Sequence, residues 1–332
     1  MTKLLTIWIP TFQRPQQLAR LIANLSSCGL SSFADIVISD NDPNSSKDLA
    51  LAQLPAEASA ARQQLTYIRN PSNLTAGINF LRAFEYTKTP WLMIVGDDDL
   101  FDARRIADLQ ALLHNLDPAI AAVKFDSSLF GMQRTSCVPS LKDYVIGLQR
   151  SQYPEAFNNL CLISNWLFRP EPFLQNISSA FLGYSSKISH LFPVLRACAE
   201  SGQRIQFSGL QPVIHGSTAE SSWPKAATWA EMIITMSCFS GFIDRSNRRA
   251  ILTLLLHSDW RRYVAKCLRI QQFYGGAAVG ISPWRIHGQL CLLSLPYLSA
   301  FLLSLPLLAL PQRLLPKRIR RRIGEPGSVD RW

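Results

Sequence analysis

The sequence predicts an α/β domain with a mostly parallel sheet, followed by a C-terminal helical region that associates with a membrane. Short apolar runs alternate with helix-like patterns over residues 4–125, which is typical of βαβ units. One of these runs, Trp91 to Val95, is unbroken, as expected of a strand that is covered on both faces. The last quarter of the chain differs, since it combines basic segments with a long apolar stretch.

The individual elements follow from these patterns. Strands are predicted at residues 4–9, 35–39, 65–68, 91–95 and 119–125. The first helix begins at Pro15, a residue favoured in the first helical turn, and continues with apolar residues at helical spacing to residue 25. Further helices are predicted at residues 47–64, from the loop around 73 to residue 86, and at 104–113. Pro55 interrupts the predicted helix at 47–64.

Three consecutive carboxylates, Asp97, Asp98 and Asp99, follow the unbroken apolar run. They lie just beyond the carboxyl end of a parallel strand, where open α/β sheets bind ligands. Mg²⁺ or Mn²⁺ would relieve the repulsion between them, because these ions prefer oxygen ligands and bridge to the phosphates of a nucleotide. The alternative is a solvated acidic turn that caps the next helix, since Asp is a common N-cap residue.

The glycine motifs that usually bind phosphates are missing. No G-x-G-x-x-G follows the first strand, and the sequence has neither a P-loop nor a G-x-S-x-G motif. A nucleotide would therefore be held by side chains at the strand ends and by a metal. The seven cysteines include no C-x-x-C pair, which indicates neither a zinc site nor a disulfide framework and fits a reducing compartment.

Four motifs occur in the order and spacing of the family 2 glycosyltransferases. Ile9-Pro-Thr-Phe-Gln-Arg14 resembles the I-P-T-Y-N-R opening of that family, and Val37-Ile-Ser-Asp-Asn41 resembles its V-V-D-N segment. The stretch from Asn73 to Asn79 is similar to N-x-x-G-x-x-x-N, and the three aspartates correspond to the D-x-D motif. The resemblance covers about residues 3–125 and implies the GT-A fold, a Rossmann-like arrangement with a nucleotide-sugar donor at the carboxyl edge of the sheet.

The resemblance also implies roles for individual residues. The nucleotide-binding residues would be Pro10, Thr11, Arg14, Asp40, Arg69, Asn73, Asp97 and Asp98. Pro10 and Thr11 would line the base pocket, and Asp40 would hydrogen-bond the base. Mg²⁺ or Mn²⁺ would be bound by Asp97, Asp99 and His215. Gly96 stands where many members have an acidic residue, which leaves open which aspartate contacts the ribose and which the metal.

His215 follows a predicted strand at residues 211–215, and some GT-A enzymes have a metal-binding histidine there; the alternative is a hydrogen-bonded surface histidine. Residues 1–125 would form the donor half of the domain and residues 126–243 the acceptor half. Inverting transfer needs a base that takes the proton of the acceptor hydroxyl. The candidates are His190, which precedes an apolar helix, Asp126, which follows the fifth strand, and then Glu220. A lone histidine beside an apolar helix is more often structural.

Residues 244–332 form the predicted membrane-association region. Residues 1–243 balance 19 basic against 19 acidic side chains, whereas segments 244–270 and 311–332 each have seven basic and two acidic residues. Residues 290–310 carry no charge but contain Pro296 and Pro306, which break a helix into short pieces. We therefore expect kinked interfacial or re-entrant helices on an anionic membrane surface. The alternative is a buried hairpin with a solvated basic tail.

The function expected from these features is that of an inverting glycosyltransferase at the cytoplasmic face of the inner membrane. It would transfer a sugar from a nucleotide-sugar donor to a lipid-linked (polyprenyl diphosphate) saccharide in bacterial surface-polysaccharide or O-antigen synthesis, and it resembles the abequosyltransferase type. A nucleotidyltransferase with the same sheet and a non-catalytic membrane scaffold are the alternatives. No nucleic acid is expected as a partner, because no aromatic residues are interleaved with the basic run at 313–322.

Overall fold

The computed structural model describes residues 2–55, 61–127, 136–138, 141–175 and 202–216. It also describes twelve single positions further along the chain, which are residues 177, 190, 191, 194, 196, 246, 249, 250, 253, 254, 302 and 314. The predicted membrane-association region at 244–332 and the candidate base Glu220 therefore lie outside the described residues, apart from those single positions. Among the residues that are described, no helix is both long and apolar enough to cross a bilayer.

A mixed eight-stranded sheet forms the centre of the domain, in the order β3-β2-β1-β4-β8-β6-β9-β7. The strands are β1 (Leu5–Thr11), β2 (Ala34–Asp40), β3 (Leu65–Arg69), β4 (Trp91–Ile94), β6 (Ile120–Phe125), β7 (Ser136–Val138), β8 (Trp166–Phe168) and β9 (Arg204–Ser208). β8 is antiparallel to both of its neighbours and β7 is antiparallel to β9, while the other pairs are parallel. Six strands thus share one direction, which confirms the mostly parallel sheet.

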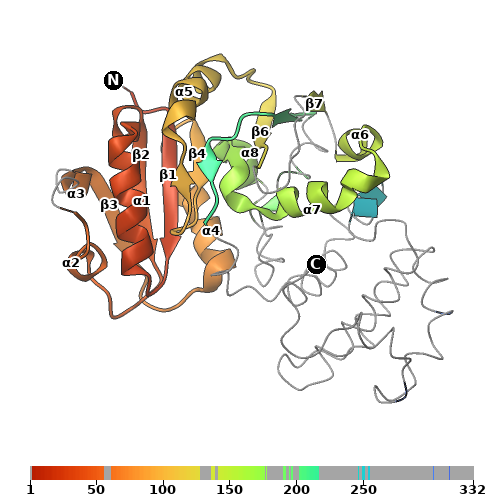
Figure 1. Ribbon diagram of the computed structural model, residues 1–332. Coiled ribbons are helices and arrows are strands. Elements are labelled where there is room, and N and C mark those ends of the chain that lie inside the picture. Colours follow the sequence, from red (N-terminus) through yellow and green to blue (C-terminus); the bar gives the residue numbers. More distant parts are fainter. Residues whose placement is uncertain are drawn as a thin grey trace.

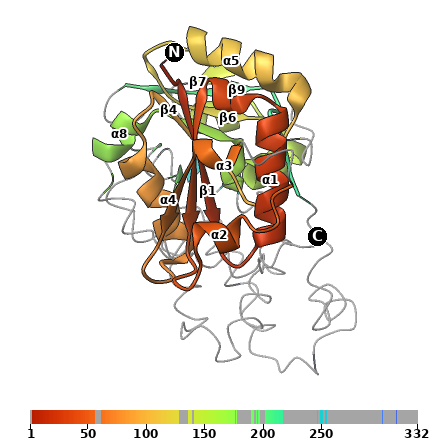
Figure 2. The same ribbon diagram turned by 90° about the vertical axis from the view of Figure 1, so that its left-hand side faces the viewer.

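Helices cover both faces of this sheet (Figures 1 and 2). They are α1 (Pro15–Ser27), α2 (Lys47–Ala50), α3 (Ala61–Gln64), α4 (Thr75–Tyr86), α5 (Ile106–Asn115), α6 (Leu141–Ile146), α7 (Tyr153–Cys161) and α8 (Pro170–Gln175). Figure 2 shows α1 and α4 on opposite sides of the strands. The predicted helix at 47–64 was wrong as a single element: α2 ends at Ala50, well before Pro55, and α3 begins at Ala61.

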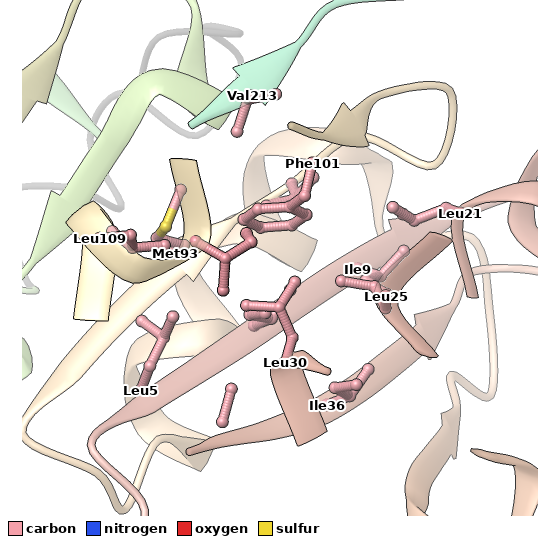
Figure 3. Packing of buried hydrophobic residues seen from close by; sticks show 14 of the residues in the cluster. Leu5, Ile9, Leu21, Leu25, Leu30, Ile36, Met93, Phe101, Leu109 and Val213 are labelled. Atoms are coloured by element: carbon pink, nitrogen blue, oxygen red, sulfur yellow. The ribbon is translucent and has the colours of Figure 1, made fainter. Parts of the chain in front are cut away.

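One hydrophobic core lies between the sheet and the layer of α1 and α5. Alternate residues of β1, including Leu5, Ile7 and Ile9, point into it and meet the apolar side of α1, with Leu21 and Leu25. Figure 3 shows Leu5, Ile9, Leu21 and Leu25 in this core, together with Phe101. Between them, Trp8 belongs to the other face, where its ring lies 5.8 Å from Tyr86 of α4. Because successive side chains of a strand point to opposite faces of the sheet, β1 contributes to the hydrophobic packing on both faces.

A second, two-stranded sheet positions the site. It pairs β5 (Leu100–Phe101) with β10 (Val213–Ile214) in antiparallel register, with Val213 opposite Phe101 and Ile214 opposite Leu100. Phe101 and Val213 both belong to the core between the sheet and the layer of α1 and α5, and they lie close together in Figure 3. The predicted strand at 211–215 is therefore real but shorter. It pairs with the segment directly after the three aspartates and not with the main sheet.

Candidate active site

The candidate site lies where the order of the strands reverses. β1 has β2 on one side and β4 on the other, and such a reversal opens a crevice at the carboxyl ends of the strands. Thr11 ends β1, Asp40 ends β2, and the Asp97–Asp99 turn follows β4. The turn is closed by a hydrogen bond from the Asp99 N–H to the Gly96 carbonyl, at 3.1 Å. The fold therefore brings three of the predicted motifs to one edge.

Asp97 is held by the first motif. Its Oδ2 accepts a hydrogen bond from the Thr11 hydroxyl at 2.7 Å, and its Oδ1 accepts one from the Arg14 guanidinium at 3.2 Å. Arg14 also pairs with Asp98 at 3.5 Å. Burial raises the pKa of Asp97 to about 6, and the hydrogen bond from Thr11 opposes this rise without cancelling it. The predicted nucleotide-binding residues Thr11, Arg14, Asp97 and Asp98 thus form one connected group.

Asp99 faces His215 across the gap between the two segments. The register of β5 and β10 brings the residue before Leu100 opposite the residue after Ile214. Asp99 Oδ1 lies 3.3 Å from His215 Nδ1 and accepts a hydrogen bond from the Gly216 N–H at 3.1 Å. Both side chains are largely buried. A residue 116 positions away in the sequence is thereby placed beside the acidic turn.

Asp99 and His215 fit a divalent cation that a nucleotide also ligates. Among the described residues, no three His, Cys, Asp or Glu side chains are grouped to hold a metal by themselves. Mg²⁺, however, is usually bound by one or two carboxylates together with substrate phosphates. Two ligands at right angles on an octahedral ion with bonds of about 2.1 Å lie about 3.0 Å apart, and the 3.3 Å between Asp99 Oδ1 and His215 Nδ1 is close to this separation. The predicted third ligand, Asp97, is not grouped with these two side chains, and its oxygens accept hydrogen bonds from Thr11 and Arg14.

The end of β2 supplies a second, buried carboxylate. Asp40 Oδ1 accepts a hydrogen bond from the Asp42 N–H at 2.9 Å, and Oδ2 accepts one from the Tyr67 hydroxyl at 2.8 Å. Burial raises the pKa of Tyr67 to about 12, which keeps its hydroxyl protonated as a donor. A carboxylate accepts about four hydrogen bonds, so Asp40 retains capacity for a ligand.

Of the other predicted nucleotide-binding residues, Pro10 and Arg69 lie in the two strands that flank β2. Pro10 is in β1 opposite Ser39 of β2. Arg69 is exposed and donates to the Ser45 carbonyl at 3.4 Å. Asn73 is also exposed, and its Oδ1 accepts a hydrogen bond from the Thr75 N–H at 3.0 Å. Thr75 has a φ of 69°, a strained conformation for a β-branched residue and one that clusters at functional sites.

The predicted base His190 is buried among aromatic rings, an environment that does not favour that role. Its side chain is 1% exposed and lies against Trp166 and Phe168, with ring centroids 6.1 and 6.2 Å away. Burial lowers the pKa of His190 to about 3, so the imidazole is both inaccessible and a poor proton acceptor. A lone histidine beside an apolar helix is more often structural, and the burial of this ring agrees with that interpretation.

The rival base, Asp126, lies directly after β6, on the same edge of the sheet as the Asp97–Asp99 turn, since β4 and β6 run in the same direction. Its Oδ1 accepts a hydrogen bond from the Ser127 N–H at 3.1 Å, whereas no donor among the described residues reaches Oδ2. Burial raises the pKa of Asp126 to about 6. The raised pKa suits the predicted role, whereas the burial of the side chain, which is 4% exposed, does not.

Sequence reasoning missed the segment that supports the acidic turn from behind. Ser164 Oγ accepts a hydrogen bond from the Gly96 N–H at 3.0 Å, and Asn165 Oδ1 lies 2.8 Å from His215 Nε2. Both residues belong to the 3₁₀ turn η5 (Ile163–Asn165) before β8. No local pattern could have identified them, because their contacts lie 68 and 50 positions away in the sequence.

Comparisons with known proteins agree with this geometry. Residues 6–158 match the model of the family described as glycosyl transferase family 2. The crystal structure of S. aureus TarS 1-349 aligns with a TM-score of 0.52 and 10% identity, over 93% of this chain and 82% of that one. The same protein in complex with UDP-GlcNAc aligns with a TM-score of 0.51 and 9% identity, over the same shares. No curated protein sequence matches the chain. At such identities the alignments show the fold.

Proposed function

We propose that this chain, whose residues 6–158 match the glycosyl transferase family 2 and whose fold is shared with TarS, is a glycosyltransferase that transfers one sugar, with inversion, to a lipid-linked saccharide. The donor is a nucleotide sugar and the acceptor a saccharide on polyprenyl diphosphate, as in bacterial surface-polysaccharide or O-antigen synthesis. The observation that carries the proposal is the meeting of Asp99 and His215 beside the Asp97 group.

In the proposed mechanism, Asp99 and His215 hold Mg²⁺ or Mn²⁺. When bound, this ion neutralises the diphosphate leaving group as the bond between sugar and phosphate breaks. Arg14 lies 3.2 Å from Asp97 and 3.5 Å from Asp98, so it offsets the charge of the two aspartates that are not on the metal. Asp97 and Asp98 would hydrogen-bond the ribose of the donor.

Asp40 supports the choice of a nucleotide as the leaving group. It is buried beside the end of β1 and has both oxygens oriented by internal donors, so its remaining lone pairs face a fixed direction. A preorganised acceptor of this kind recognises the N–H of a base. The TarS complex with UDP-GlcNAc, a protein of the same fold, supports a donor of this chemical class.

Asp126 is the proposed base that accepts the proton of the acceptor hydroxyl. Its raised pKa of about 6 suits proton transfer near neutral pH better than that of an ordinary aspartate, because the most effective base has a pKa close to the operating pH. The side chain is 4% exposed and its Oδ2 is buried, so the proposal requires that acceptor binding uncovers this oxygen. Its carboxylate lies at the site edge of β6, from which an acceptor would approach the donor on the side away from the leaving diphosphate.

The acceptor and the location are inferred from the C-terminal sequence. An uncharged stretch at 290–310 and a basic run at 317–322 favour a surface of anionic lipids, where a polyprenyl-linked saccharide is found. Nucleotide sugars are cytosolic, so the proposed location is the cytoplasmic face of the inner membrane. Leu302, the described residue within the uncharged stretch, has a side chain that is 54% exposed, which is compatible with contact to lipid.

A thermal-shift screen tests the donor and the metal together. UDP, GDP, CDP and TDP are added separately, each with and without Mn²⁺. A ligand at about a hundred times its Kd stabilises the folded protein by about 2.7 kcal/mol, so we expect a higher Tm with one nucleotide only, and only when Mn²⁺ is present. Equal shifts with and without the ion would contradict the proposed metal role.

Donor hydrolysis separates a glycosyltransferase acting on a nucleotide sugar from a nucleotidyltransferase or a non-catalytic scaffold. We expect slow release of free sugar from the matching donor and its loss in Asp99→Ala. The control is Asp108→Ala, a change at an exposed aspartate of α5 that leaves the acidic turn intact. Formation of a nucleoside triphosphate and a sugar 1-phosphate from the donor when pyrophosphate is added, without free sugar, would favour the nucleotidyltransferase.

A further inference from the structure

A chain of hydrogen bonds connects His215 to the interior of the domain. Asn159 Nδ2 donates to the Phe125 carbonyl at 3.4 Å, and Asn159 Oδ1 accepts from Asn165 Nδ2 at 3.2 Å. Asn165 Oδ1 in turn lies 2.8 Å from His215 Nε2. The two asparagines are 3% and 0% exposed, so water does not compete for these contacts.

The anchor of this chain determines the direction of every bond in it. The Phe125 carbonyl can only accept, so Asn159 must turn its amide nitrogen toward it and its oxygen toward Asn165. Asn165 must then donate to Asn159 and present its own oxygen to His215. A reversed amide at either position would place two acceptors or two donors face to face, at a cost of about 1–3 kcal/mol for each unsatisfied buried group.

The orientation of Asn165 determines which nitrogen of His215 carries the proton. Because Asn165 presents an acceptor, His215 Nε2 is the donor, and in a neutral imidazole the lone pair is then on Nδ1. That lone pair faces Asp99 Oδ1 across 3.3 Å. Two acceptors that face each other at this distance form a site for a cation.

We propose that Asn165 and Asn159 are positioning residues that fix the tautomer and ring orientation of His215, so that Nδ1 and Asp99 Oδ1 are presented together to the divalent ion. The proposal rests on the metal role of Asp99 and His215 in the proposed function. It assigns to the two asparagines the part that outer partners of metal-ligating histidines commonly have, which is to hold the proton on the nitrogen remote from the metal.

The backbone of Asn165 is also fixed. Lys124, which is 1% exposed in β6, donates its Nζ to the carbonyls of Asn165 at 3.2 Å and Leu162 at 3.5 Å. On the other side, the neighbouring Ser164 hydroxyl accepts the Gly96 N–H. The turn that carries Asn165 is thus joined to the ends of both β4 and β6. The acidic turn and the histidine partner therefore share one rigid support.

The tautomer can be observed directly in the metal-free wild-type protein. Long-range ¹H–¹⁵N correlation spectra at alkaline pH distinguish the two neutral tautomers of each histidine, and the spectrum of His215→Gln assigns the resonances. We expect the Nε2–H tautomer for His215. A His215 that carries its proton on Nδ1, or that populates both forms equally, would overturn the proposal, and this result requires no variant of the asparagines to fold.

Variants of Asn165 test the consequence for the metal. Asn165→Leu removes the acceptor at similar volume, and we expect both tautomers of His215 and a fall in Mn²⁺ affinity, measured by EPR titration, of about 10- to 100-fold. Asn165→Asp keeps an oxygen toward Nε2 and should retain the Nε2–H tautomer. The matched control is Asn79→Leu, which removes a buried amide that donates to the Ser39 carbonyl at 3.1 Å and should alter neither the tautomer nor the Mn²⁺ affinity.

The two proposals fail in different ways. Unchanged Mn²⁺ affinity in Asn165→Leu, or an equal loss in Asn79→Leu, would overturn the positioning role. A wild-type protein that does not bind Mn²⁺ even with the matching nucleotide would instead contradict the proposed metal-dependent function. The tautomer of the wild type would still decide whether Asn165 orients the ring.

Discussion

Three aspartates in a row occupy three different environments. Asp97 is buried against Thr11 and Arg14, Asp98 is partly exposed beside Arg14, and Asp99 faces His215. The sequence left open which of them contacts the metal, because three identical side chains carry no local distinction. The structure supports Asp99, since the pairing of β5 with β10 brings an imidazole to it. One turn thus presents three carboxylates in three directions.

Asp97→Asn is expected to stabilise the metal-free and nucleotide-free protein at neutral pH. The folded-state pKa of Asp97 is about 6 against an ordinary value of 3.8, so the fold favours the protonated form. The ionised form therefore destabilises the protein above about pH 6, by on the order of 2–3 kcal/mol. The increase in the free energy of unfolding of the variant over the wild type should shrink as pH falls from about 6 to about 4 and vanish below that range. Urea unfolding across this range measures it.

Asp117→Asn is the control with the opposite sign. The hydrogen bond from the Ala119 N–H lowers the pKa of Asp117, so this exposed carboxylate stabilises the protein above its unfolded pKa. The variant should be the less stable protein at neutral pH, and the difference should vanish as pH falls through the lowered pKa. A stability gain of Asp97→Asn that did not depend on pH would contradict the assigned environment of Asp97.

At the scale of elements, the short β5–β10 pair does more for the site than its length indicates. Phe101 and Val213 anchor the pair in the core between the sheet and the layer of α1 and α5. The Asp102 N–H also donates to the Pro212 carbonyl at 2.9 Å. Beyond β10 the chain passes so close to the acidic turn that a Cβ at Gly216 would lie 2.6 Å from the Asp98 carbonyl oxygen. A glycine is required at that position by the approach of two backbones.

Gly216→Ala is expected to separate His215 from Asp99. A contact of 2.6 Å with a backbone atom cannot be relieved by a side-chain rotation, so the chain after β10 must move. We expect Mn²⁺ affinity and donor hydrolysis to fall at least about tenfold, as for the loss of an outer metal partner. EPR titration and a hydrolysis assay measure the two effects.

Gly202→Ala is the matched control for that substitution. Gly202 has a φ of +67° and no atom within 4 Å of an added Cβ, so alanine is strained there by about 1–2 kcal/mol without contacting the site. It should lower the Tm and leave Mn²⁺ affinity unchanged. Equal Mn²⁺ affinities in both variants would show that the close approach at Gly216 does not position the metal site.

At the scale of the whole molecule, the proposed acceptor requires contact with a membrane. The replacement of five basic residues by glutamine tests this contact: Lys317, Arg318, Arg320, Arg321 and Arg322. Each basic residue near an anionic surface contributes about 1 kcal/mol, so we expect the wild type to sediment with phosphatidylglycerol vesicles at low salt and the variant to bind far more weakly. Neutral phosphatidylcholine vesicles are the control. Equal binding of both proteins would contradict the electrostatic attachment.

The alternation of apolar runs and helical patterns determined the sheet and its helices, because each element buries the face that its own spacing defines. It also determined the acidic turn, since a strand that ends in aspartates delivers them to one edge. The resemblance had already predicted that His215 joins Asp99, whereas only the tertiary structure showed that the His190 ring is buried. Exposure and proximity depend on contacts between segments far apart in the chain, such as Asn165 with His215, and these arise only when the strands are assembled.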